Sequence, residues 1–92
     1  MEIRKSNIVR SAAGRDSGKL FLVLEAEGEY LLLADGKGRK LESPKRKKRR
    51  HVSFVSDMET RVSRKILEGE KISNSELRRT LAAFREAADQ EG

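Results

Sequence analysis

Two neighbouring apolar runs limit what this chain can fold into. Leu20–Leu24 reads LFLVL and Tyr30–Ala34 reads YLLLA, with a charged turn around Gly28 between them. Such runs predict β-strands, but a strand with one solvated face would alternate apolar and polar residues. Phe21 and Val23 stand where that alternation requires polar residues. Both faces therefore need cover: a small barrel can enclose one of them, and another element must shield part of the other.

Short β segments accompany these runs throughout residues 1–55. We expect strands near residues 7–11, 19–25, 29–34, 39–41 and 51–55. Asp35-Gly36 predicts a hairpin turn, and Pro44 followed by a basic run predicts a loop. Five short strands in about 50 residues are typical of a small, strongly bent barrel.

Residues 56–92 have a helical pattern. Ser56–Glu59 reads S-x-x-E, a capping box, and predicts a helix of about 12 residues that ends at Gly69. Ser73–Glu76 repeats the box and predicts a second helix of about 16 residues, with Ile72 and Leu77 as a hydrophobic staple. The expected apolar stripes are Met58, Val62 and Ile66 on the first helix, and Leu77, Leu81, Phe84 and Ala88 on the second. These stripes either pack on the barrel or form a partner or dimer surface. The predicted fold is thus mainly β with α, a five-stranded barrel (1–55) followed by a helical hairpin (56–92).

The positive charge is confined to the first part of the chain. Of 92 residues, 21 are Lys or Arg and 15 are Asp or Glu, a net charge of +6. Residues 1–56 hold fourteen of these cations against seven carboxylates, whereas residues 57–92 hold seven against eight. A single small domain with this bias should attract polyanions and release counterions when it binds them.

The composition also excludes several classes of protein. No cysteine is present, so disulfides and thiolate metal sites are excluded and an intracellular, cytoplasmic location is expected. The longest apolar runs have five residues, far fewer than the roughly 20 that span a bilayer. No apolar segment follows the N-terminal charges as in a secretory signal. We expect no membrane association.

The glycine-rich segment Ala13–Lys19, AGRDSGK, invites comparison with a phosphate-binding loop of a nucleotide enzyme. In the Walker A motif four residues separate the glycines and a hydroxyl follows the lysine. Here three residues separate Gly14 and Gly18, Leu20 follows the lysine, and a strand follows where a helix is needed. We interpret the segment as a turn between antiparallel strands whose tip carries Arg15 and Lys19; the alternative is a plain solvated turn.

Six adjacent basic residues, Lys45–Arg50, are the most conspicuous feature. Like charges at this density stay extended until a polyanion neutralises them. If all six met phosphates, log affinity would fall with log salt at a slope of about −4 to −5. Such contacts give affinity with little sequence information. A solubilising loop and a nuclear import signal are the alternatives.

The sequence contains no clear set of residues for catalysis or for stacking on bases. His51 is the only histidine, no serine or threonine has a histidine–carboxylate relay, and the carboxylates fall at turns and helix surfaces. We therefore expect no enzyme, metal, cofactor or small-molecule substrate. The four aromatic residues lie within apolar runs and are predicted to be core, which favours backbone and shape recognition over stacking on bases: Phe21, Tyr30, Phe54 and Phe84.

Two segments together carry a family resemblance. Val9–Lys19, VRSAAGRDSGK, and Ala34–Lys48, ADGKGRKLESPKRKK, resemble the KOW domain, an SH3-like barrel of ribosomal proteins and transcription elongation factors. The resemblance covers roughly residues 6–54 and is closest to KOW proteins grouped with archaeal and eukaryotic large-subunit ribosomal proteins and their small bacterial relatives. Nothing from the family carries over to residues 56–92.

The resemblance implies binding to RNA, mainly ribosomal RNA, with ribosomal proteins as further partners. The predicted RNA-binding residues are Arg10, Arg15, Lys19, Lys37, Arg39, Lys40, Lys45, Arg46, Lys47, Lys48, Arg49 and Arg50. The rival hypothesis is a protein-interaction module of a transcription or translation factor, which would bind its partner through the stripe of Leu77, Leu81 and Phe84.

Overall fold

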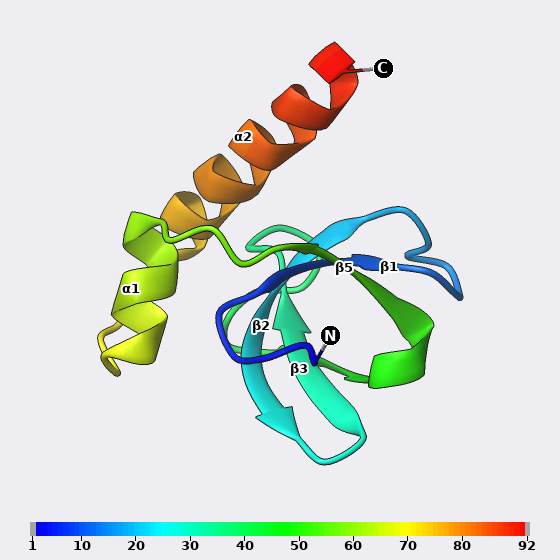
Figure 1. Cartoon of the computed structure of the whole chain (residues 1–92). Coiled ribbons are helices and arrows are strands. Elements are labelled where there is room, and N and C mark those ends of the chain that lie inside the picture. The colour runs from blue at the N-terminus through cyan, green and yellow to red at the C-terminus, as the bar shows by residue number, and fades with distance from the viewer. Residues whose placement is uncertain (1, 92) are drawn as a thin grey trace.

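The protein is mainly β: five antiparallel strands form one sheet, and two helices follow it (Figure 1). The computed structural model describes residues 2–91, with the side chains described through residue 86. The elements are β1 (Ile8–Ser11), β2 (Leu20–Glu27), β3 (Tyr30–Ala34), β4 (Lys45–Lys48), a 3-10 turn (Arg49–His51), β5 (Val52–Ser56), α1 (Arg61–Leu67) and α2 (Asn74–Glu91).

The strands are arranged in the order β4-β3-β2-β1-β5, so the first strand pairs with both the second and the last. Irregularities interrupt the register between Ile8 and Val9 on β1, opposite β5, and between Val23 and Glu25 on β2, opposite β3. Such bulges increase the local twist and bend of a sheet. Figure 1 shows the resulting strong curvature.

One face of the sheet encloses a cluster of Val9, Phe21, Val23, Leu31, Leu33 and Val52. Val52 lies on β5 and Leu31 on β3, and these strands are separated by β1 and β2. The strands can bring both residues into one cluster because the sheet bends around this face. Phe21 and Val23, the residues that break alternation, are 1% and 0% exposed here.

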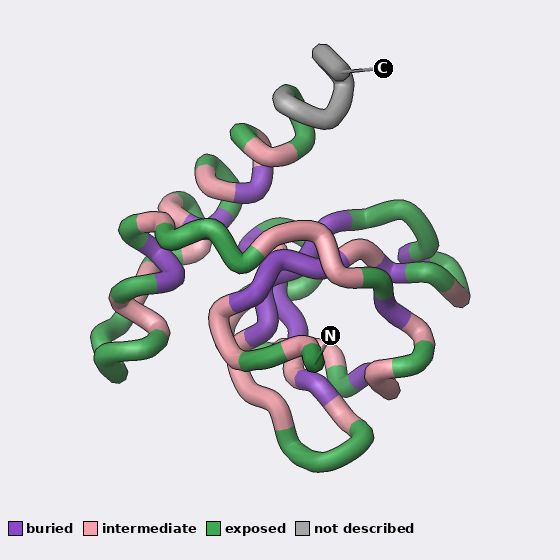
Figure 2. The backbone as a smooth tube through the Cα atoms, viewed as in Figure 1, coloured by how far each residue is buried: buried purple, intermediate pink, exposed green. Residues whose placement is uncertain are grey.

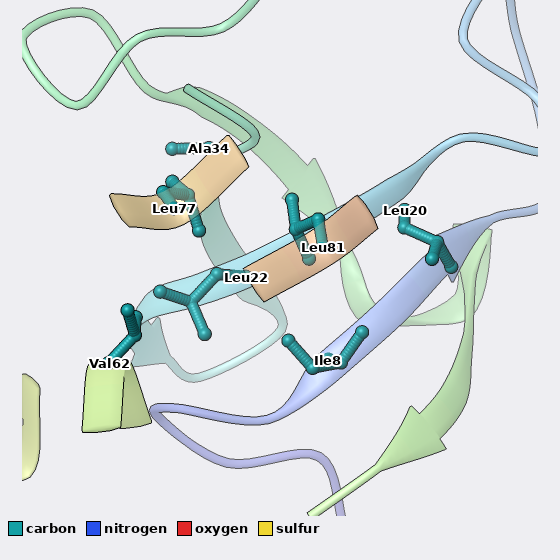
Figure 3. Close-up of a cluster of buried hydrophobic side chains, with 7 residues drawn as sticks. All are labelled: Ile8, Leu20, Leu22, Ala34, Val62, Leu77 and Leu81. Carbon is teal, nitrogen blue, oxygen red and sulfur yellow. The ribbon is translucent and has the colours of Figure 1, made fainter. Parts of the chain in front are cut away.

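The helices cover the opposite face. Leu22 of β2 and Ile8 of β1 join Val62 of α1 and Leu77 and Leu81 of α2 in a second buried cluster (Figure 3). Figure 2 shows how burial concentrates along the middle strands and on the sides of the helices that meet them. The expectation that both faces of the apolar strands need cover is confirmed.

The helix boundaries differ from the expected ones. α1 begins at Arg61 after a capping box made by Thr60 and Ser63, in which each side chain accepts a hydrogen bond from the other residue's backbone N–H. The box predicted at Ser56–Glu59 was therefore wrong, and Met58 lies before the helix and is 64% exposed. α1 has 7 residues and α2 has 18, rather than about 12 and 16.

The second helix starts as expected. Ser73 Oγ accepts a hydrogen bond from the backbone N–H of Glu76 at 3.1 Å. Gly69 has φ +75° just after α1, which fits its predicted role in ending that helix. The side chain of Ala88, the last residue of the expected stripe, lies outside the described residues.

Two predictions between β3 and β5 were wrong. Residues 39–41 form no strand, because Asp35 N and Gly36 N both donate to Arg39 O and close a tight turn there. Lys45–Lys48 are not a loop but strand β4, paired with β3. The strong β-former β3 supplies the backbone partner, so a strand forms here despite its charged side chains.

Candidate nucleic-acid interface

The loop from Ala12 to Lys19 between β1 and β2 is closed by its own backbone. Ser11 N donates to Lys19 O at 2.9 Å, and Gly18 N donates to Ser11 O at 2.8 Å. Gly14 and Gly18 have φ of +84° and +90°, a region that side chains rarely adopt. The loop therefore presents Arg15 and Lys19, both exposed, on a fixed frame.

Asp16 anchors this loop to β4. Its carboxylate accepts hydrogen bonds from Ser11 Oγ, Lys45 Nζ and Lys47 Nζ, each at 2.8 Å. Lys47 Nζ also donates to Ala13 O at 2.7 Å. Burial of Asp16 opposes its ionisation, but the hydrogen bonds from the two lysines and the serine outweigh that cost and hold its pKa well below the usual range. Asp16 therefore forms a buried ion cluster with the two lysines of β4.

The loop from Asp35 to Pro44 between β3 and β4 is held from two sides. Asp35 Oδ1 accepts from the backbone N–H groups of Lys37 at 2.9 Å and Arg39 at 2.8 Å. The start of α2 holds the rest: Arg78 donates to Gly36 O at 2.7 Å, and Asn74 Oδ1 accepts from the backbone N–H of Leu41 at 2.9 Å.

A cationic groove lies where these two loops meet. It consists of two adjoining hollows that share Lys19, Asp35 and Gly38. The cations that line it are Arg15, Lys19, Lys37, Arg39, Lys45 and Arg85. The lining carboxylates are Asp16 and Asp35. Six cations and two carboxylates give the lining residues a net charge of +4. Lys47, which also pairs with Asp16, is not among these residues.

Five of the six groove cations are residues that the sequence predicted for RNA binding. Arg85 of α2 was missed, because residues 57–92 have no net positive charge and no basic run. Its position relative to Arg78 is a usable signal: residues seven apart on a helix share a face. Arg78 contacts the β3–β4 loop and Arg85 lines the groove farther along α2.

Alternation along β4 divides the basic run between two faces. Lys45 and Lys47 lie opposite Leu33 and Leu31, whose side chains belong to the enclosed cluster, and both lysines reach Asp16. Lys47 is 8% exposed. Its ammonium is already bound within the protein, so a contact of all six residues with one polyanion does not fit this arrangement.

Arg46 and Lys48 point to the other face of β4. The guanidinium of Arg46 stacks over Tyr30 at 3.8 Å from the ring centroid. Tyr30, predicted as core, is half-buried and serves as this stacking platform. Lys48 and Arg50 line a separate hollow with Glu29.

Three further predicted residues lie outside the groove lining. Arg49 of the 3-10 turn donates to the backbone carbonyls of Gly28 and Ile3, so its guanidinium is used within the fold. Arg10 of β1 donates to Gly18 O at 2.9 Å and so helps to hold the β1–β2 loop. Lys40 is exposed in the β3–β4 loop.

Other kinds of site find little support. Among residues 2–86, whose side chains the structure describes, no group of three or more His, Asp or Glu side chains is placed to hold a metal ion. Within residues 2–91, neither helix is long and apolar enough to cross a membrane. His51 is half-buried in the 3-10 turn.

Comparison with known proteins adds no assignment. The chain matches no protein-family model and no curated protein sequence.

Proposed function

We propose that this protein is a non-enzymatic RNA-binding protein that grips an RNA backbone in the cationic groove between the β1–β2 and β3–β4 loops. In this proposal the bent sheet is an SH3-like barrel of the KOW type, and the target is ribosomal RNA or the ribosome. The cysteine-free composition fits a cytoplasmic location.

One observation carries the proposal: the convergence of Arg15, Lys19 and Arg39 in one groove from two loops that the fold holds in place. None of the three forms an ion pair with a carboxylate among the described residues. Unpaired cations on loops whose backbone is held can bind phosphates without first ordering a loop or breaking an internal contact. The half-exposed Lys45 adds to the charge at one end of the groove while remaining bound to Asp16.

The groove also indicates what is recognised. Phe21 is its only aromatic lining residue and is 1% exposed, so no ring is displayed for a base to stack on. Arginine and lysine side chains without a stacking platform favour contacts to phosphate and sugar. The groove therefore suits recognition of the backbone and shape of RNA.

The rival hypothesis needs the apolar stripe of α2 as a docking surface. Leu77 and Leu81 are both 0% exposed, and Phe84 packs against the same buried cluster. Leu77 and Leu81 serve as core in this fold, and only the half-buried Phe84 leaves part of its side chain open to a partner.

The test replaces three groove cations and compares the variant with a matched control. Arg15→Gln, Lys19→Gln and Arg39→Gln together remove three charges from the groove; Arg61→Gln, Lys71→Gln and Arg79→Gln remove three exposed charges elsewhere. At about 1 kcal/mol for each screened phosphate contact, the groove variant should lose on the order of 100-fold in affinity for a ribosomal RNA fragment.

The salt dependence separates contact from general attraction. The slope of log affinity against log salt should fall by about 2 to 3 in the groove variant, because about 0.7 to 0.9 is lost for each contact. The control triple should keep the slope and co-sediment with ribosomal subunits like the unmodified protein. Equal losses in the two triples would contradict the proposed groove.

A further inference from the structure

Six cations by themselves do not explain a preference for RNA. RNA and DNA carry the same phosphates, and lysine and arginine in a groove bind either backbone. The group that distinguishes the two is the ribose 2′-hydroxyl, which both donates and accepts hydrogen bonds. Selection of RNA by this groove therefore requires a partner for that hydroxyl.

Asp35 is the one groove carboxylate with a free oxygen. It lines both hollows of the groove. Its Oδ1 is committed to the backbone N–H groups of Lys37 and Arg39. Its Oδ2 has no hydrogen-bond or ion-pair partner within 2–86, the residues whose side chains the structure describes. Asp16, the other carboxylate, is fully engaged by Ser11 and two lysines.

The approach to this oxygen is open. Gly38 also lines both hollows, and a Cβ on this glycine would lie 3.9 Å from Asp35 Oδ2. The absence of a side chain at position 38 keeps that space clear. Lys19 from the opposite loop lines the same shared part of the groove.

A lone acceptor among phosphate-binding cations sets a requirement on the ligand. A carboxylate repels phosphate, so a backbone seated on Lys19 and Arg39 must offer a hydrogen-bond donor to Oδ2 or leave it desolvated and unpaired, which is costly. The 2′-hydroxyl is the only donor of a sugar-phosphate backbone, and DNA lacks it.

We propose that Asp35 Oδ2 accepts a hydrogen bond from a ribose 2′-hydroxyl and so makes the groove select RNA over DNA. This inference rests on the proposed function. In addition to the phosphate contacts, it gives the groove one contact that recognises the sugar.

The first experiment uses the unmodified protein and three oligonucleotides of one sequence: RNA, 2′-O-methyl RNA and the 2′-deoxy form with uracil retained. All three carry the same bases, so donors on the bases are held constant. We expect RNA to bind about 10-fold more tightly than either analogue, since leaving a buried acceptor without a donor lowers the affinity by about that factor. Binding of none of the three would contradict the proposed function; equal binding of all three would leave that function standing and refute the inference.

The second experiment changes Asp35 itself. Asp35→Asn keeps an oxygen that can accept from Lys37 and Arg39 and replaces the free oxygen by an amide NH₂. The preference for RNA over 2′-O-methyl RNA should fall below 2-fold, because an amide NH₂ can donate to the 2′-oxygen of either but accepts from neither. The 2′-deoxy oligonucleotide should bind more tightly because a negative charge has left the groove. Asp57→Asn, at an exposed position outside the groove, makes the same charge change and should keep the RNA preference. An unchanged preference in Asp35→Asn would show that the carboxylate only caps its turn.

A third variant leaves the carboxylate in place. Gly38→Val covers Oδ2 at a position with no left-handed backbone requirement, and should remove the preference for RNA while weakening binding to the 2′-deoxy form by less than 3-fold. This variant decides the matter if thermal unfolding shows that Asp35→Asn is not folded. Retention of the full preference in Gly38→Val would overturn the inference.

Discussion

Removal of the Asp16 carboxylate should destabilise the protein more than any other single loss of charge. Lys47, whose side chain is 8% exposed, would keep one hydrogen bond in Asp16→Ala, to Ala13 O. Removing one partner of a buried ion pair costs about 3 to 5 kcal/mol. The lower figure applies here because Lys45, at 27% exposure, can turn towards solvent.

A loss of about 3 kcal/mol is large for this chain. A domain of this size has a free energy of unfolding on the order of 5 kcal/mol. A loss of that size corresponds to a decrease in Tm of roughly 10 to 20 °C. Urea unfolding at pH 7, followed by circular dichroism, measures the difference directly.

A double-mutant cycle identifies the cause. Asp16→Ala combined with Lys47→Met removes both buried charges, so the double variant should be more stable than the sum of the two single losses predicts, by about 1.5 kcal/mol or more. Lys45→Met should cost about 1 kcal/mol or less, because that ammonium is partly solvated. Additive losses for Asp16 and Lys47, or a loss below 1 kcal/mol in Asp16→Ala, would refute the argument.

The remaining predictions concern acidity, a glycine contact and the helix core. Because the folded-state pKa of Asp16 is depressed, its contribution to the free energy of unfolding is complete above the unfolded-state pKa of about 3.9 and is lost as the pH falls towards the folded-state pKa. The difference in the free energy of unfolding between the protein and Asp16→Asn should therefore decrease from pH 5 to pH 2 in urea titrations. A constant difference would contradict the role of the carboxylate. Gly36→Ala should lower the free energy of unfolding by about 2 to 4 kcal/mol, since φ is +79° and a Cβ would lie 2.5 Å from a backbone oxygen of α2. Gly28→Ala, with φ +58° and open space around the Cβ, should lower it by about 1 kcal/mol when both variants are compared by thermal unfolding. Similar losses of stability in the two variants would rule out the contact. Leu81→Ala should cost about 2 to 5 kcal/mol and Leu67→Ala, at a residue 62% exposed, less than 0.5 kcal/mol; denaturant midpoints that move equally would count against α2 as core.

Local patterns predicted the elements that are stabilised by apolar side chains. Phe21 and Val23 break the alternation of β2, and this alone showed that both faces of the strand are covered. The helical spacing of Leu77 and Leu81 predicted a helix with an apolar stripe, for which packing on the sheet was one of two possible roles. These patterns are readable because burial of apolar surface acts through side-chain identity, which the sequence states directly.

Elements fixed by distant partners were not predictable in the same way. Strand β4 consists of lysines and arginine, and what makes it a strand is the backbone of β3 beside it. Asp16 is 29 and 31 residues from Lys45 and Lys47, so no local spacing indicates that their charges meet. The run of like charges was therefore predicted to be a loop, although Lys45–Lys48 form a strand whose alternation places neighbouring side chains on opposite faces.

The helical extension has two physical roles. Leu77 and Leu81 bury one face of the sheet, while Arg78 and Asn74, on the same helix, hold the backbone of the β3–β4 loop. A ligand that binds to an ordered loop does not have to supply the free energy of ordering it, so fixing the loop in advance increases affinity without adding a contact. Gly36 makes this possible because it allows the loop to approach the start of α2 more closely than any other residue would. In the proposed function, therefore, the helix that completes the core also sets the geometry of one wall of the RNA groove.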